Sequence, residues 1–335
     1  MCIIDAVLLF VLAGIWGSSF AFMRFLSPLI GPVATIVVRM MVAGIALAAF
    51  FAVTGFRAGW RKNWPRFLAI GVLNSSAPFT LFAIGALHLP GAVEAILNAT
   101  TPMFGALAAA VFLGERITAK RSLGLLLGIA GVGLMTGLGA VPRDLVGLLS
   151  AGACLLAALF YGVASVYIKK RAADIPSLAV AGGSQLLGGL ALAPFLAAAP
   201  PRLAAVDLRV GLAALVFGLL CSGVAYVIFY RLIARVGPTR TLTVTFLAPI
   251  FAMLWGFLFL GEAVTLSMIV GVVVILGGTY LVVAPQRAAG AASGSEQEPP
   301  RAIGPAPRET GQEEPRRAAG ALLPPRLRPR RSSRG

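Results

Sequence analysis

The tetrapeptide Phe112-Leu113-Gly114-Glu115 occurs a second time in the chain as Phe259-Leu260-Gly261-Glu262, 147 residues later. The same offset aligns residues 71–134 with residues 218–281 without a gap. Further identities along this alignment are Gly71 with Gly218, Ser75 with Ser222, Pro102 with Pro249, Phe104 with Phe251, Thr118 with Thr265, Gly124 with Gly271 and Gly131 with Gly278. Apolar composition alone does not place a proline, a Gly-Glu pair, a threonine and several glycines in the same order twice. The pattern therefore predicts an internal duplication.

The composition of the chain is that of a membrane protein. Of its 335 residues, 59% are hydrophobic and 12% are charged, whereas roughly a quarter of the residues in a soluble domain are charged. One core cannot hide so much apolar surface from water, so we expect the chain to lie in a lipid bilayer. An internal duplication in such a hydrophobic chain is typical of a transporter built from two repeats.

The net charge of +16 does not indicate a nucleic-acid partner. Residues 285–335 contain ten Arg and five Glu and therefore account for +5 of this charge. The rest lies mostly in short segments between apolar runs, where Lys and Arg orient membrane helices. Residues 286–335 are also rich in Pro, Gly and Ala, a composition that cannot bury enough surface to fold. We therefore expect a disordered, Arg/Pro-rich cytoplasmic tail.

Ten segments are long and apolar enough to be transmembrane helices, which need about 20 residues each. They are residues 5–26, 32–54, 66–87, 91–113, 122–140, 146–167, 177–198, 209–232, 239–260 and 267–284. The predicted fold class is thus all-α and integral to the membrane, with ten transmembrane helices arranged as two inverted five-helix repeats. The repeats are expected to span residues 1–140 and 141–285.

The loops between these segments alternate in positive charge. Most Lys and Arg residues follow the second, fourth, sixth and eighth segments or lie in the tail, so the positive-inside rule places both termini in the cytoplasm. Loop 114–121 contains three basic residues, whereas its copy, 261–268, contains none. Because five helices per repeat place equivalent loops on opposite sides, this exchange of charge predicts an inverted repeat.

Several short motifs occur in a characteristic order. They are Trp16-Gly17-Ser18-Ser19-Phe20, Gly31-Pro32 followed by Arg39, then Glu94, Asn98-Ala99-Thr100-Thr101-Pro102 and the two copies of Phe-Leu-Gly-Glu. Together with the duplication, they make residues 5–284 resemble the drug/metabolite transporter superfamily, specifically the bacterial EamA-type ten-span transporters. The resemblance implies a secondary active transporter of the bacterial inner membrane. Such a protein exports or exchanges a small metabolite, amino acid or drug by alternating access.

Two charged residues stand out in the predicted helices, because a charge in the hydrocarbon region costs a few kcal/mol and usually indicates function. Arg39 lies seven residues, or roughly 10 Å, into the second helix, and Glu94 lies near the start of the fourth. Both helices enter the bilayer from the non-cytoplasmic side, so the two side chains are expected to be able to meet. Two interpretations stay open. The residues form an ion pair that locks the helices together, or they bind a charged substrate group or carry a coupled proton.

Neutral polar residues complete the predicted substrate site. Asn98 and Thr101 precede Pro102, which removes a backbone donor and loosens the fourth helix. Polar residues recur at or near the equivalent positions of the second repeat. We therefore expect a cavity between the repeats, near the middle of the bilayer, lined by Arg39, Glu94, Asn98, Thr101, Gln185, Ser222 and Thr245. Polar contacts that only join helices are the alternative. The fifth and tenth helices, which are apolar along nearly their whole length, are expected to be peripheral.

The remaining patterns favour a transporter over other membrane proteins. The sequence has one histidine, no His-Glu-x-x-His and no Asp-x-x-Asp, so we predict no metal site, no cofactor and no enzymatic activity. It has no Walker motif and no recognisable pore loop. An intramembrane enzyme or a channel-like component is the alternative. The expected partners are a small-molecule substrate and the lipid bilayer, and a homodimer is left open. Glu115 and Glu262, at the membrane edge, are expected to bridge or cap the turns in which they lie.

Overall fold

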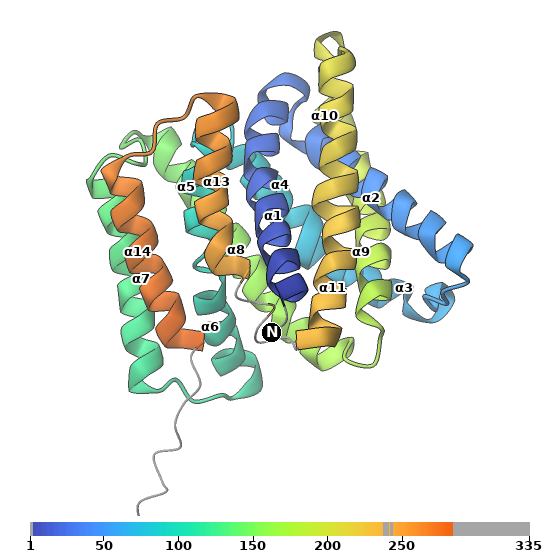
Figure 1. Ribbon diagram of the computed structural model, residues 1–335, viewed down its shortest axis with the longest axis horizontal. Helices are drawn as coiled ribbons and strands as arrows, with labels where there is room; N and C mark the ends of the chain where they lie inside the picture. Colours follow the sequence, from blue (N-terminus) through green and yellow to red (C-terminus); the bar gives the residue numbers. More distant parts are fainter. Residues whose placement is uncertain (1–2, 237–240, 242–243, 284–335) are drawn as a thin grey trace, which may run out of the picture. The chain divides into compact units, whose positions relative to one another are not determined.

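The computed structural model describes residues 3–236, 241 and 244–283, and all regular secondary structure in these residues is helical (Figure 1). The predicted tail, residues 286–335, lies outside the described residues.

The helices follow the predicted segments closely. In the first half of the chain they are α1 (Ile3–Ile30), α2 (Pro32–Thr54), α3 (Trp60–Gly71), α4 (Ala77–Gly85), α5 (Gly91–Asn98), α6 (Thr101–Leu113) and α7 (Ala119–Gly137). In the second half they are α8 (Leu145–Arg171), α9 (Ser177–Leu192), α10 (Leu208–Gly218), α11 (Ala225–Val236), α13 (Val244–Leu260) and α14 (Leu266–Val283). Two short π-helical segments, η1 (Val72–Ser76) and η4 (Leu219–Val224), and two 3-10 segments, η2 (Ala193–Ala197) and η3 (Leu203–Ala205), join some of them.

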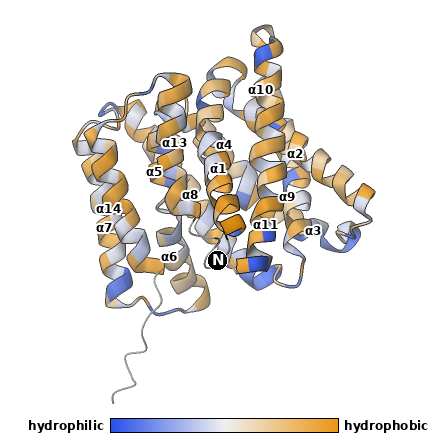
Figure 2. Ribbon diagram, in the orientation of Figure 1, coloured by the Kyte–Doolittle hydropathy of each residue, from blue (hydrophilic) through white to orange (hydrophobic). Residues whose placement is uncertain are grey.

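These helices are those of a multi-pass membrane protein. Among the described residues, eight helical segments are long and apolar enough to cross a membrane, and α13 is a shorter apolar helix. The first turn of α7 contains Lys120 and Arg121, whose charges lower its mean hydropathy. Figure 2 shows hydrophobic residues along most of the helices and hydrophilic residues mainly near helix ends. That all ten predicted segments cross the bilayer stays a prediction.

Helices from the two halves of the chain pack against each other. α1 packs along α13, α6 along α8, and α7 along α14. A Cβ atom at Gly17 of α1 would lie 2.6 Å from Phe251, and a Cβ atom at Gly162 of α8 would lie 2.6 Å from Phe104. Phe104 and Phe251 are equivalent residues of the duplication. Because glycine has no side chain, Gly17 and Gly162 allow the two helix pairs to approach closely at matching positions.

The two copies of Phe-Leu-Gly-Glu end their helices in the same way. Gly114 and Gly261 have φ angles of 68° and 66°, in the left-handed region that glycine adopts without strain. The amide of the following glutamate donates to a carbonyl six residues earlier, at 3.3 Å for Glu115 and 3.1 Å for Glu262. The repeated sequence thus forms a repeated turn.

Two helices contain π-helical turns that the sequence analysis did not predict. η1 begins at Val72 and η4 at Leu219, and these residues are equivalent at the offset of 147. At the end of each, the backbone N–H of the next residue donates to the carbonyl five residues earlier, from Ala77 to Val72 and from Ala225 to Leu220. Such turns add a residue to the helix, redirect the side chains that follow, and occur frequently at functional sites.

The predicted fourth span is interrupted between α5 and α6, at Ala99 and Thr100, just before Pro102. Proline has no amide hydrogen, so the helical hydrogen bonds are broken here. The carbonyl of Ala99 accepts a hydrogen bond from Thr279 Oγ1 of α14, at 2.8 Å. α14 therefore supplies a buried hydroxyl to this interruption. It packs mainly along α7, at one edge of the helices in Figure 1, and its peripheral position relative to the substrate site stays a prediction.

Candidate substrate site

Arg39 is the centre of a buried polar cluster. It lies in α2 and is 5% exposed. Its Nε donates to Ser222 Oγ of η4 at 3.0 Å, and its Cζ lies 3.8 Å from the ring centroid of Phe79 and 4.6 Å from that of Phe217. In the part of the chain that the structure describes, no carboxylate oxygen lies within 4.0 Å of its nitrogens. The guanidinium is thus stabilised by aromatic faces and a hydroxyl, without an ionic partner there.

Gln185 and Ser75 form a second polar pair. Gln185 Nε2 of α9 donates to Ser75 Oγ of η1 at 3.3 Å, and both residues are fully buried. Ser75 is the counterpart of Ser222 in the duplication. In each pair, a long polar side chain from one half of the chain reaches a serine in the π-helical turn of the other half. Tyr226 lies near both Arg39 and Gln185. The identity of Ser75 and Ser222 was the sequence signal that could have added Ser75 to the predicted site.

Aromatic rings from both halves surround these pairs. Two sets pack with ring centroids 5.2 to 6.4 Å apart: Tyr161 on Phe79 and Phe82, and Trp16 on Tyr226 and Phe229. In each set, a ring from one half of the chain lies against the helix that follows the π-helical turn of the other half. The site therefore combines a buried cation with packed aromatic rings, a combination that suits an amphipathic ligand.

Glu94 lies in a different buried environment. It is fully buried in the first turn of α5, its Oε1 lies 3.9 Å from Cys154 Sγ of α8, and its Oε2 has no hydrogen-bond partner among the described residues. The expected meeting of Arg39 and Glu94 does not occur, because Arg39 points toward η4 and Glu94 toward α8. The charged groups that act on Glu94 are instead Glu262 and Arg24.

Asn98, Thr101 and Thr245 are all half-buried. Thr101 Oγ1 donates to Asn98 Oδ1 at 3.2 Å, across the interruption between α5 and α6. Thr245 lies in the first turn of α13, a helix that packs on α5. The structure thus brings two pairs of predicted site residues together. Arg39 contacts Ser222, and Thr101 contacts Asn98. Gln185 pairs with Ser75, which was not among the predicted site residues.

The repeated glutamates each connect their turn to another helix. Glu262 Oε1 accepts a hydrogen bond from the amide of Gly91 at 3.2 Å and lies 3.7 Å from Arg24 Nε. Glu115 accepts a hydrogen bond from Lys169 Nζ at 3.1 Å. Burial raises the pKa of Glu262 despite its two partners, whereas the hydrogen bond from Lys169 lowers the pKa of Glu115. Glu115 also accepts a hydrogen bond from Arg121 of α7 at 3.4 Å and so bridges its turn to the next helix as expected. Glu262 instead connects its turn to α5 and α1 rather than to the next helix, α14.

Comparison with known proteins shows similarity over most of the chain. The EamA-like transporter family matches it twice, over residues 4–137 and 148–284. A probable terminal-alkyne amino-acid exporter from Streptantibioticus cattleyicolor is 29% identical over 267 residues, which cover 80% of this chain and 89% of that protein. Protein PecM from Dickeya dadantii is 26% identical over 270 residues, which cover 80% of this chain and 88% of that protein.

A solved crystal structure aligns with a TM-score of 0.59 at 20% identity and covers 83% of this chain and 96% of that chain, a likeness that supports the fold alone. The matched family consists of transporters rather than enzymes, and it matches both halves of the chain. This chain therefore belongs to the EamA-like transporter family.

Proposed function

We propose that this protein is a secondary active transporter of the bacterial inner membrane that exports or exchanges a small carboxylate-bearing metabolite, such as an amino acid, by alternating access. The observation that carries this proposal is Arg39. It is buried between Phe79 and Phe217 and bonded to Ser222, and no carboxylate of the described residues lies within 4.0 Å.

The chemistry of Arg39 favours a carboxylate as the substrate group. A cation inside the hydrocarbon region costs a few kcal/mol and usually marks a functional site. A guanidinium binds a planar carboxylate through two parallel hydrogen bonds, and such contacts are stronger where water is excluded. The surrounding rings would accept the apolar part of the molecule. The relative named as an amino-acid exporter supports the same substrate class.

The proposed architecture is ten membrane-spanning helices in two inverted repeats, residues 1–140 and 141–285, with both termini in the cytoplasm. Three features support it. The turns at Gly114 and Gly261 match, η1 and η4 begin at equivalent residues, and Ser75 and Ser222 each bond to a side chain of the other half. A site built from two oppositely oriented halves can open to either side of the membrane in turn.

Cysteine labelling tests the inverted orientation. Ile117 and Val264 are equivalent residues in the two loops and are 40% and 44% exposed. In a variant without Cys2, Cys154 and Cys221, Val264→Cys is expected to react with an impermeant thiol reagent outside intact cells. Ile117→Cys is expected to react only after the membrane is permeabilised. Equal labelling of both variants in intact cells would contradict inverted repeats.

Counterflow in proteoliposomes tests the transport activity. Vesicles loaded with a high concentration of an unlabelled apolar amino acid are expected to accumulate the labelled form transiently, because a carrier exchanges one molecule for another. The amide of the same amino acid, which lacks the carboxylate, is expected to exchange at least tenfold more slowly. A channel would produce no transient accumulation, and an enzyme would alter the labelled compound. Equal exchange of amide and acid would contradict the role given to the carboxylate.

A further inference from the structure

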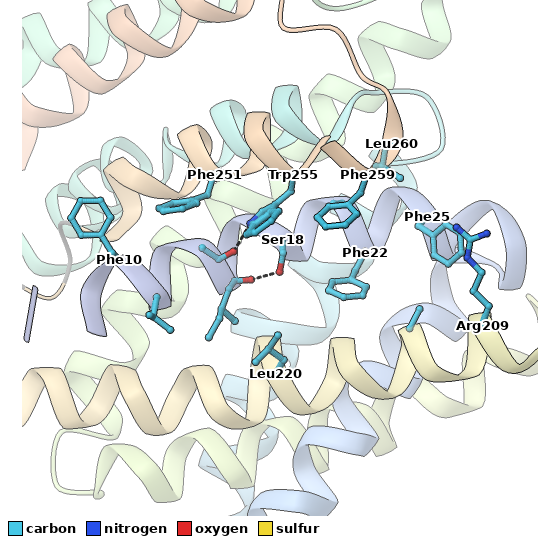
Figure 3. A pocket seen from close by; sticks show the side chains of 15 residues that line it. Phe10, Ser18, Phe22, Phe25, Arg209, Leu220, Phe251, Trp255, Phe259 and Leu260 are labelled. Carbon is cyan, nitrogen blue, oxygen red and sulfur yellow. Dashed lines mark hydrogen bonds between the residues drawn. The ribbon is translucent and has the colours of Figure 1, made fainter. Parts of the chain in front are cut away.

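An apolar groove runs along α1, with α13 on one side and α10 and η4 on the other (Figure 3). Its volume is about 720 Å³. Phe251, Trp255 and Phe259 of α13 line one wall, and Leu220 of η4 lies opposite. Since α1 belongs to the first half of the chain and the other helices to the second, the groove follows a boundary between the halves.

The polar atoms in the middle of the groove are bonded to other groups of the protein. Ser18 Oγ donates to the carbonyl of Ile15 at 2.8 Å, and Trp255 Nε1 donates to the carbonyl of Gly14 at 2.8 Å, as the dashed lines in Figure 3 show. The groove is hollow here because α1 presents the small residues Gly14, Ser18 and Ala21. A molecule lying in this part must therefore be apolar.

The positively charged side chain of Arg209 lies at one end of the groove. Arg209 lies there beside Phe25, with its Cζ 5.3 Å from the ring centroid, and Phe10 lies at the opposite end (Figure 3). Arg209 is exposed, and no carboxylate lies within 4.0 Å of its guanidinium in the described ranges. The nearby Asp207 caps α10, with Oδ1 accepting a hydrogen bond from the amide of Val210 at 2.7 Å. Arg209 can therefore receive an anionic group.

The groove is longer than the apolar part of one leaflet. Its lining on α1 extends from Phe10 to Phe25, which is about 22 Å at 1.5 Å per residue. One leaflet contributes only roughly 15 Å to the hydrocarbon core. A disordered boundary lipid would not fill this length, whereas an acyl chain held in an extended conformation would.

We propose that the groove binds one anionic phospholipid, with its phosphate at Arg209 and one acyl chain extended along α1 toward Phe10. With the proposed topology, Arg209 lies on the non-cytoplasmic side, so the lipid comes from the outer leaflet of the inner membrane. The bound chain fills the space between α1 and the helices of the second half. It thereby supports the boundary along which the two halves meet, a role separate from that of the substrate site around Arg39.

Measuring which phospholipid the full chain retains tests whether Arg209 binds an anionic headgroup. Protein purified in mild detergent is incubated with phosphatidylglycerol and phosphatidylethanolamine of identical acyl chains and analysed by native mass spectrometry. The wild-type protein is expected to retain one phosphatidylglycerol with about tenfold preference. Arg209→Gln is expected to remove the preference. Arg202→Gln removes a charge from the same connecting segment, where Arg202 donates to the Pro28 carbonyl, and is expected to keep it.

A second pair of variants tests the path of the acyl chain. Ala21→Phe fills the floor of the groove and is expected to reduce retention of phosphatidylglycerol about tenfold. Ala49→Phe makes the same change on the exposed surface of α2 and is expected to have no effect. Thermal unfolding of each variant shows whether it is folded. Absence of any lipid preference in the wild-type protein, or equal losses in the control variants, would overturn the proposal. Displacement of the lipid by a transported amino acid would also overturn it, because the groove would then belong to the substrate path.

Discussion

Arg39→Gln is expected to reduce exchange of a carboxylate substrate about 100-fold while the amount of folded protein stays unchanged. Glutamine is polar but lacks both the charge and the two parallel donors that a carboxylate requires. Loss of a hydrogen bond to a charged group costs up to about 3 kcal/mol, and each 1.4 kcal/mol corresponds to about a tenfold change. Folding should not suffer, because the change removes a buried charge that has no ionic partner within the described residues. Counterflow in proteoliposomes and size-exclusion chromatography measure the two effects.

Two further variants separate substrate binding from a structural role for Arg39. Arg57→Gln removes a charge from an exposed position and is expected to exchange substrate at the wild-type rate. Arg39→Lys keeps the charge but loses the planar donor pair, so an intermediate rate with a raised apparent KM is expected. Wild-type exchange by Arg39→Gln would remove Arg39 from the binding site. Loss of the folded protein in that variant would show that the residue acts in packing.

The helix positions could be predicted because the length of an apolar run in the sequence corresponds to the length of a membrane helix. α2 has the predicted bounds, residues 32–54. Pro32 can begin a helix without losing a hydrogen bond, and Gly55 ends it with a φ of 68°, a left-handed conformation suited to glycine. The offset of 147 residues likewise pointed to the paired turns at Gly114 and Gly261, because identical short sequences form identical caps.

The geometry within the site could not be predicted in the same way, because it depends on helix rotation. A regular helix assigns each residue to a face through its period of 3.6, but η1 and η4 each insert an extra residue and change the direction of the following side chains. Arg39 and Glu94 were expected to enter from the same side of the membrane. In the structure, Arg39 of α2 points toward Ser222 and Glu94 of α5 points toward Cys154. The hydrophobic pattern of the sequence does not show in which direction either side chain points.

Glu94→Gln is expected to abolish accumulation driven by a pH gradient and to leave substrate exchange near the wild-type rate. Glu94 is fully buried, and no cation of the described residues lies within 4.0 Å of it. An ionised carboxylate without a partner is costly in a dry site, whereas a carboxyl group in contact with water ionises readily. A protein that exposes this group to each side of the membrane in turn would carry a proton through the cycle. Glutamine preserves the shape of the side chain but cannot release a proton.

The two transport modes are measured in the same vesicles, as uptake under an imposed pH gradient and as counterflow at equal pH. Glu115→Gln is the matched control, because Glu115 lies in a loop and accepts a hydrogen bond from Lys169; both modes are expected to remain. The double variant Arg39→Met with Glu94→Gln is expected to lose both transport modes. The two residues contact different partners, so removing one charge does not leave the other without an ionic partner. Accumulation that persists in Glu94→Gln would place the coupling at another group. Recovery of abundance and transport in the double variant would instead mean that Arg39 and Glu94 form an ion pair during the cycle, because only then would removing both charges cancel the cost of removing one.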